Sequence, residues 1–242
     1  MRLTRVFVEE PLSAGRGCSL QGSAANHIMR VLRSREGDVL TLFDGRGGEY
    51  GARIVGFRKD SVQVEVQEHR NVERESSLDL TLAQGISRGE RMDWVMQKAT
   101  ELGVTRIIPV ITEHTMVKLD ERQSERKIEH WRGIVISACE QSGRNRVPDV
   151  AAPTSYYDVI RTLDPSATRV LLSPVGTLRA RDLAQPKHIA MLIGPEGGLS
   201  DNEQEAAIAA GFQQVRMGPR ILRTETAAIA ALAAFQHDFG DI

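Results

Sequence analysis

Two glycine-proline segments near the end of the chain carry the residue types best suited to holding a small ligand. The first is Gly194-Pro195-Glu196-Gly197-Gly198, and the second is Met217-Gly218-Pro219. Each follows an expected strand and precedes an expected helix. Glycine allows the main chain to approach a ligand closely and to adopt positive φ, whereas proline stiffens a turn and removes an N–H donor. The two segments therefore predict a pocket built mainly from main-chain groups.

A third turn, Leu172-Ser173-Pro174, follows another apolar stretch. Ligands of parallel sheets bind at the carboxyl ends of the strands, where all three turns are expected to lie. The turns lack a P-loop lysine and a complete dinucleotide fingerprint. The glycines between 45 and 51 have the wrong spacing for that fingerprint and precede a strand, so they indicate a hairpin. Apolar walls with free amides suit a flat neutral group such as adenine.

The elements that must position these turns alternate between strand and helix from about residue 78. Helical spacing of Met92, Val95, Met96 and Ala99 predicts a helix that ends near Gly103. Ile128 to Ala138, Val159 to Leu163 and Ala227 to Phe235 predict further helices. Strands are expected at 78–83, 106–111, 169–172, 189–193 and 214–217. This alternation is typical of an α/β fold with a parallel sheet covered on both faces.

The first part of the chain has a different rhythm. Residues 38–43, 49–57 and 61–66 are expected strands, and residues 24–33 are the one helix-like piece. We interpret this part as a small β-barrel with one helix. The polar stretch 73–77 is a plausible linker. The expected domains are therefore residues 1–72 and residues 73–242.

Positive charge gathers at the start of the chain. Residues 1–35 hold six arginines and two acidic residues, although the whole chain has a net charge of -1. Guanidinium groups match phosphates well, so Arg2, Arg5, Arg30 and Arg33 are candidate contacts to an RNA backbone. His27 is a candidate for stacking on a base. The alternatives are a solvated helix face for the arginines and a packing role for the histidine.

Bulk composition excludes several classes of site and of protein. Cys18 and Cys139 lie far apart and the six histidines are scattered, so neither a disulfide scaffold nor a metal site is expected. Two free thiols suit a reducing cytoplasm. No apolar run has the length of a membrane helix, and the first residues have no signal core. We expect a cytoplasmic protein without a membrane segment or metal.

Gly-Pro-Glu-Gly-Gly-Leu-Ser at 194–200 and Gly-Pro-Arg-Ile-Leu-Arg-Thr-Glu-Thr-Ala-Ala at 218–228 resemble the RsmE family of SPOUT-class methyltransferases. Further similar stretches are residues 27–33 with 37–38, residues 91–103 and residues 140–144. The resemblance therefore covers nearly the whole chain. Two departures are mild, because Met217 replaces the usual leucine and residues 114–118 vary a stretch often rich in arginine and serine.

This resemblance implies a fold, a cofactor and partners. The expected fold is an N-terminal PUA-like RNA-binding β-barrel followed by a SPOUT methyltransferase domain whose last segments form a deep trefoil knot. The family methylates N3 of a uridine in small-subunit (16S) ribosomal RNA, uses S-adenosyl-L-methionine and usually forms homodimers. The substrate is small-subunit ribosomal RNA or an assembled 30S particle. The expected cofactor-binding residues are Leu172, Ser173, Pro174, Gly194, Glu196, Gly197, Met217, Gly218, Leu222, Arg223, Thr226 and Ala227.

Methyl transfer to uridine N3 requires loss of the N3 proton, so a base or a stabilising cation is needed. Arg144 and Arg88 are candidates for stabilising the uridine anion or holding a phosphate. Glu225 is a candidate proton acceptor, with helix capping as its alternative role. Two other functions remain open. The chain could be a SPOUT methyltransferase for another RNA or position, or a ribosome assembly factor without catalysis. A nucleotide-dependent oxidoreductase is disfavoured by the missing fingerprint.

Overall fold

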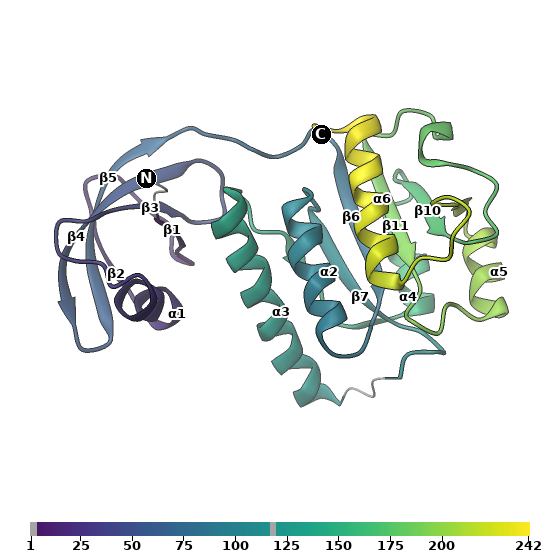
Figure 1. Ribbon diagram of the computed structural model, residues 1–242, viewed down its shortest axis with the longest axis horizontal. Helices are drawn as coiled ribbons and strands as arrows, with labels where there is room; N and C mark the ends of the chain where they lie inside the picture. The colour runs from purple at the N-terminus through teal and green to yellow at the C-terminus, as the bar shows by residue number, and fades with distance from the viewer. Residues whose placement is uncertain (1–3, 117–119) are drawn as a thin grey trace. The chain divides into compact units, whose positions relative to one another are not determined.

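The computed structural model describes residues 4–116 and 120–242 (Figure 1). Arg2 from the candidate RNA contacts, and Val117 and Lys118 from the variant stretch, lie outside these ranges. Contacts divide the chain into two compact units. Unit 1 comprises residues 1–75 and 139–147, and unit 2 comprises residues 76–138 and 148–242. The two domains expected from the sequence, residues 1–72 and 73–242, did not anticipate that residues 139–147 belong to unit 1.

Unit 1 is built on a five-stranded mixed sheet. Its strands are β1 (Thr4–Phe7), β2 (Gly17–Leu20), β3 (Val39–Phe43), β4 (Glu49–Arg58) and β5 (Ser61–Arg70), in the order β1-β3-β4-β5-β2. β1 pairs parallel with β3, and the other pairs are antiparallel. The turn at Asp44-Gly45 joins β3 to β4 as a hairpin, as expected. The period-two pattern thus predicted the long strands, whereas the two short edge strands were missed.

One helical segment closes the core of unit 1. The expected helix at 24–33 consists of α1 (Gly22–Asn26) and a π-helical turn (His27–Val31). Ile28 is fully buried in a core cluster that contains residues from all five strands, including Val6, Leu20 and Leu40. Arg33 ends the segment with φ of 51°, a left-handed conformation that stops the helix. One side of the segment therefore packs inward and the other stays in solvent.

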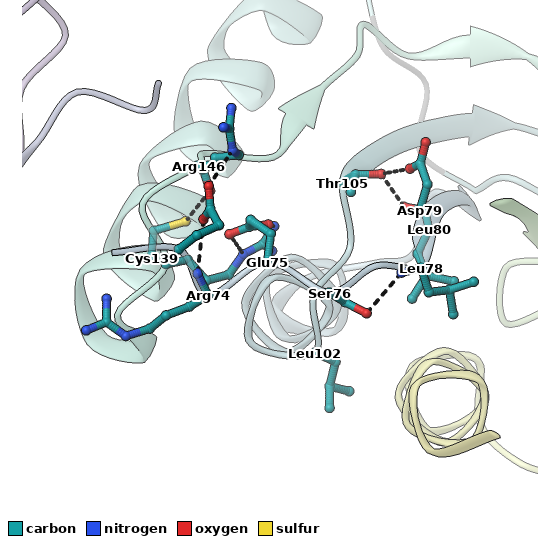
Figure 2. Close-up of polar contacts among 12 residues, drawn as sticks. Arg74, Glu75, Ser76, Leu78, Asp79, Leu80, Leu102, Thr105, Cys139 and Arg146 are labelled. Atoms are coloured by element: carbon teal, nitrogen blue, oxygen red, sulfur yellow. Dashed lines mark hydrogen bonds and ion pairs between the residues drawn. The ribbon is translucent and has the colours of Figure 1, made fainter. Parts of the chain in front are cut away.

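A polar cluster holds residues 139–147 within unit 1. Arg144 is bonded to both carboxylate oxygens of Glu75, and its side chain is 6% exposed. Arg5 donates to Glu49 at 2.5 Å and to Asn145 at 2.6 Å. Figure 2 shows Arg74 and Glu75 near Cys139, whose thiol lies 3.6 Å from the carbonyl of Arg146. These bonds satisfy charges that would be costly to bury alone.

Unit 2 contains a seven-stranded parallel sheet. The strands are β6 (Asp79–Gly85), β7 (Arg106–Ile111), β8 (Asp149–Val150), β9 (Thr154–Ser155), β10 (Thr168–Leu172), β11 (His188–Ile193) and β12 (Gln213–Val215). Their order is β12-β10-β11-β6-β7-β8, with β9 also paired to β7. β6 begins just after Ser76, whose hydroxyl accepts from the Leu78 amide at 3.2 Å (Figure 2). The expected parallel sheet is confirmed.

Helices cover this sheet on both faces. They are α2 (Glu90–Glu101), α3 (Glu121–Ser142), α4 (Tyr156–Thr162), a short 3-10 helix η2 (Ala180–Asp182), α5 (Asp201–Ala209) and α6 (Thr224–Phe239). α2 packs beside α6, and α4 packs beside α5 (Figure 1). Ala190 and Leu192 of β11 join a core with Val159 of α4 and Ala207 of α5. None of the helices in the described ranges is long and apolar enough to cross a membrane.

Candidate active site

A cavity of about 600 Å³ opens at the carboxyl ends of β10, β11 and β12. This volume is in the range of small-molecule binding sites. The three turns that follow these strands form most of its wall, together with the start of α6. The lining residues are Arg91, Leu171, Leu172, Ser173, Pro174, Ile193, Gly194, Pro195, Glu196, Gly198, Leu199, Gln204, Val215, Arg216, Met217, Gly218, Arg220, Ile221, Leu222, Arg223, Thr224, Glu225 and Ala227.

A buried chain of hydrogen bonds joins β6 and the start of α6 to the first glycine-proline turn. The Thr224 hydroxyl donates to the Gly194 carbonyl at 2.6 Å and accepts from the Gln84 amide at 2.9 Å. Gln84 is fully buried in β6 and also donates to the Gly85 carbonyl. The N-cap of α6 is Arg223, without a side-chain cap bond, so the Thr224 side chain links β6 to the turn after β11 rather than capping the helix. The start of α6 is thereby fixed against the end of β11.

The first turn is also held by the start of α5. Ser200 and Glu203 form a capping box, with bonds of 3.2 Å and 2.9 Å. Glu203 is fully buried and its second oxygen accepts from the Glu113 amide at 2.9 Å. His114 Nδ1 lies 3.0 Å from the Gly197 carbonyl. Residues after β7 therefore support the turn after β11.

One arginine and two glutamates form the charged part of the cavity wall. Arg91 lies 2.7 Å from Glu196 Oε1, and its Nε lies 3.9 Å from Glu225 Oε1. Glu196 also accepts from the Arg88 amide at 2.9 Å. Partial burial opposes ionisation of Glu196, but the Arg88 amide and the Arg91 guanidinium outweigh it and lower its pKa. Glu196 is therefore a carboxylate at neutral pH.

Two buried polar atoms in the cavity wall lack a hydrogen-bond partner among the described residues. They are Ser173 Oγ and Glu225 Oε2. Buried polar atoms are nearly always bonded in folded proteins, so an orphaned pair in a cavity indicates a polar ligand. Within residues 4–116 and 120–242, no three His, Cys, Asp or Glu side chains come together as a metal site.

The predicted cofactor contacts fall largely on this cavity. Ten of the twelve line it, namely Leu172, Ser173, Pro174, Gly194, Glu196, Met217, Gly218, Leu222, Arg223 and Ala227. Gly197 is outside the lining and accepts from His114, and Thr226 is exposed on α6. Their direct roles stay predictions.

The three candidate catalytic side chains occupy different places. Glu225 lines the cavity, and its side chain is 16% exposed. Arg88 contacts the site through its main-chain amide, which bonds Glu196. Arg144 belongs to unit 1, where Glu75 binds its guanidinium. The cavity itself is lined by residues of unit 2.

Three of the candidate RNA contacts are exposed. His27, Arg30 and Arg33 lie on the solvent side of the helical segment in unit 1. Arg5 differs, because its side chain is 13% exposed and its guanidinium is bonded to Glu49, to Asn145 and to the Arg144 carbonyl. The structure therefore gives Arg5 an internal role in unit 1.

Sequence reasoning missed the cavity-lining arginines at 91, 216 and 220. Arg91 was noted only within a matching stretch, because a single arginine on an amphipathic helix resembles any solvated residue. Arg216 and Arg220 flank the second glycine-proline turn, and this position was the available signal.

Two family models match the chain. Residues 74–236 match an RNA methyltransferase domain, and residues 20–67 match an RNA methyltransferase PUA domain. The chain is 34% identical to ribosomal RNA small subunit methyltransferase E of Buchnera aphidicola subsp. Schizaphis graminum, covering 100% of this chain and 98% of that protein. The corresponding Bacillus subtilis protein is 32% identical, with 98% and 94% covered.

Two solved structures are also similar over their full length. A methyltransferase from Legionella pneumophila in complex with SAM is 41% identical, with a TM-score of 0.97 and 100% of both chains covered. A ribosomal RNA small subunit methyltransferase E from Neisseria gonorrhoeae, bound to S-adenosyl methionine, is 40% identical, with a TM-score of 0.93 and 100% of both chains covered.

Proposed function

The chain belongs to the family of ribosomal RNA small subunit methyltransferase E, and on this premise we propose that it methylates N3 of a uridine in small-subunit (16S) ribosomal RNA. S-adenosyl-L-methionine is the proposed methyl donor. The observation that carries the proposal is the cavity formed by the two glycine-proline turns, which contains an orphaned carboxylate oxygen of Glu225.

The residues of the cavity fit S-adenosylmethionine. Leu171, Ile193 and Leu199 offer apolar surface for adenine, and the glycines expose main-chain groups to its edge. Ser173 Oγ has an unused hydrogen-bonding capacity for a polar group of the ligand. The carboxylate of Glu196 complements the positive charge of the cofactor. When bound, the cofactor supplies an electrophilic methyl group.

Glu225 is the proposed acceptor of the N3 proton. Uridine N3 must give up its proton to become nucleophilic, and the bond from N3 to the methyl carbon would form as the methyl–sulfur bond breaks and leaves its electron pair on sulfur. A carboxylate that lines the cavity and has an unbonded oxygen can take this proton. The proton thereby moves to the protein, and the uridine reacts as a nucleophile.

Arg91 is the proposed cation beside the uridine anion. Its side chain is 43% exposed and lies in the cavity wall, so its ion pair with Glu196 is weak and can be shared with a substrate. Arg88 remains a second candidate, because it adjoins the same carboxylate through its amide. Arg144 remains a candidate for holding substrate, although Glu75 already occupies its guanidinium.

The remaining parts of the proposal concern assembly and RNA binding. We propose that the chain works in the cytoplasm as a homodimer and that its last segments form the trefoil knot of SPOUT proteins. The PUA-like unit is proposed to contact RNA through His27, Arg30 and Arg33, which are exposed. Direct phosphate contacts by Arg2 and Arg5 also stay proposals. The substrate is free ribosomal RNA or an assembled 30S particle.

Calorimetric titration and methyl transfer test this function together. Wild-type protein is expected to bind S-adenosylmethionine and to methylate small-subunit particles from cells that lack the protein, with N3-methyluridine identified by mass mapping. Glu225→Gln is expected to slow single-turnover transfer by roughly 10²- to 10⁴-fold, with little change in cofactor affinity. Glu205→Gln on the exposed side of α5 is the matched control.

Each alternative function predicts a different result. A ribosome assembly factor without catalysis would show no binding of S-adenosylmethionine. A methyltransferase for another target would bind the cofactor and leave uridine N3 unmodified. Transfer by Glu225→Gln within threefold of the control would remove Glu225 from its assigned role.

A further inference from the structure

A second cavity lies beside the turn that follows β12. Its volume is about 610 Å³. The lining residues are Arg179, Ala180, Arg181, Arg216, Met217, Gly218, Pro219 and Asp238. Arg216, Met217 and Gly218 line both cavities. The turn therefore borders both the proposed cofactor site and the second cavity.

Positive charge dominates this second cavity. Arg179, Arg181 and Arg216 are exposed, and none of their guanidinium groups forms an ion pair with a residue in the described ranges. The one acidic lining residue, Asp238, lies 2.9 Å from His237 Nδ1. Asp182 accepts from the Arg179 main-chain amide rather than from its side chain. Three arginines with one acid give a local excess of positive charge in a chain whose net charge is -1.

The main chain holds two of these arginines in place. η2 carries Arg181, begins just after Arg179 and packs against α6. The Arg216 amide donates to the Leu178 carbonyl at 2.8 Å, which links the turn after β12 to the segment before η2. The main chain of these arginines is thus held by hydrogen bonds and packing, while their side chains are exposed to solvent. Such an arrangement binds an extended anion at little cost in chain ordering.

We propose that this arginine cavity binds the phosphate backbone of the substrate RNA, and this inference rests on the proposed function. Guanidinium groups bind phosphate oxygens in pairs and keep their charge at every physiological pH. Two of the three arginines lie outside the cofactor cavity, so they contact nucleotides next to the target rather than the target itself. The lining has no aromatic ring for base stacking, so the contact is to the backbone and independent of base sequence.

The test is the double variant Arg179→Ala/Arg181→Ala, which leaves Arg216 and the cofactor cavity intact. The probe is a labelled transcript of small-subunit ribosomal RNA, titrated at several salt concentrations. We expect about tenfold weaker binding near physiological salt and a loss of roughly two from the slope of log affinity against log salt. Affinity for S-adenosylmethionine should stay within twofold, which shows that the variant is folded.

The control is Arg161→Ala/Lys187→Ala, which removes the same charge. Arg161 lies in the last turn of α4, which leads to β10, and Lys187 directly precedes β11, so both lie toward the amino ends of the strands. If the Arg179→Ala/Arg181→Ala variant had the same RNA affinity and salt slope as this control, the proposed role of the arginine cavity would be overturned, even if wild type methylates the particles normally. Conversely, if the Arg179→Ala/Arg181→Ala variant lost affinity and salt slope as expected but the wild-type protein transferred no methyl group, the proposed function would be overturned and the arginine cavity would stand.

Discussion

Gly85 is where the smallest change in side chain should disturb the proposed cofactor site most. It is the last residue of β6 and is buried. A Cβ at this position would lie 2.4 Å from the nitrogen and 2.6 Å from Cδ of Pro195, and 2.8 Å from the carbonyl carbon of Gly194. Ordinary contacts between such atoms are about 3.5 Å. Gly85→Ala therefore requires a separation of roughly 1 Å between β6 and the turn.

The turn should move rather than the strand, because β6 is hydrogen-bonded to β7 and β11 on both sides. Overpacking of this kind costs about 1–3 kcal/mol. The displaced turn forms part of the cavity wall, so the cost of overpacking should weaken ligand binding. Affinity for S-adenosylmethionine is expected to fall about tenfold or more, since 1.4 kcal/mol is a factor of ten. Calorimetric titration measures the affinity, and thermal unfolding measures the stability.

Gly133→Ala is the control, because a Cβ there meets no atom within 4 Å on helix α3. This control should bind the ligand as wild type does and gain up to about 1 kcal/mol from helix preference. A folded Gly85→Ala protein whose affinity stays within twofold of wild type would refute the reasoning.

Two further changes test other contacts. Thr224→Val should lower the free energy of unfolding by about 1–3 kcal/mol in urea denaturation, because the Gly194 carbonyl loses its donor. Thr224→Ser should restore it, and equal stability of the two variants would contradict the role of the hydroxyl. Glu49→Gln should cost about 3 kcal/mol at pH 7, because Arg5 loses its carboxylate partner. Burial opposes ionisation of Glu49, but Arg5 and Arg74 outweigh it and lower its pKa, so this stabilisation is present above the ordinary value of 4.5 and is lost as pH falls through the lowered pKa. Urea denaturation at pH 7 and pH 3 should show the difference from wild type shrinking at low pH, and a constant difference would contradict the assignment.

The sequence predicted the elements whose apolar pattern is long enough to be regular. β4, β5, β6, β7, β10, β11 and the helices α2, α3 and α6 were all expected close to their observed positions. The two-residue strands β8 and β9 were missed, because a period cannot be read from two residues. The expected strand at 214–217 ends at Val215, since the next residues belong to the turn.

The candidate site was predictable where it depends on main-chain geometry. Glycine and proline restrict or release the backbone locally, so their positions located the turns around the cavity. Contacts between distant residues were not predictable. Gln84 reads as one polar residue within a strand, and only the fold brings it to Thr224. In the same way, nothing in the sequence around Arg144 indicates its partner Glu75.

The membership of residues 139–147 in unit 1 determines when this unit can complete its folding during synthesis of the chain. Arg5, Glu49 and Glu75 leave the ribosome early, but their partners Arg144 and Asn145 follow much later. At typical bacterial translation rates of about 5–20 residues per second, the nascent N-terminal unit waits roughly 4 to 14 s for residue 147. During that interval its arginines and glutamates have only one another and water. The N-terminal unit is thus first in sequence but cannot finish folding before residue 147 has left the ribosome.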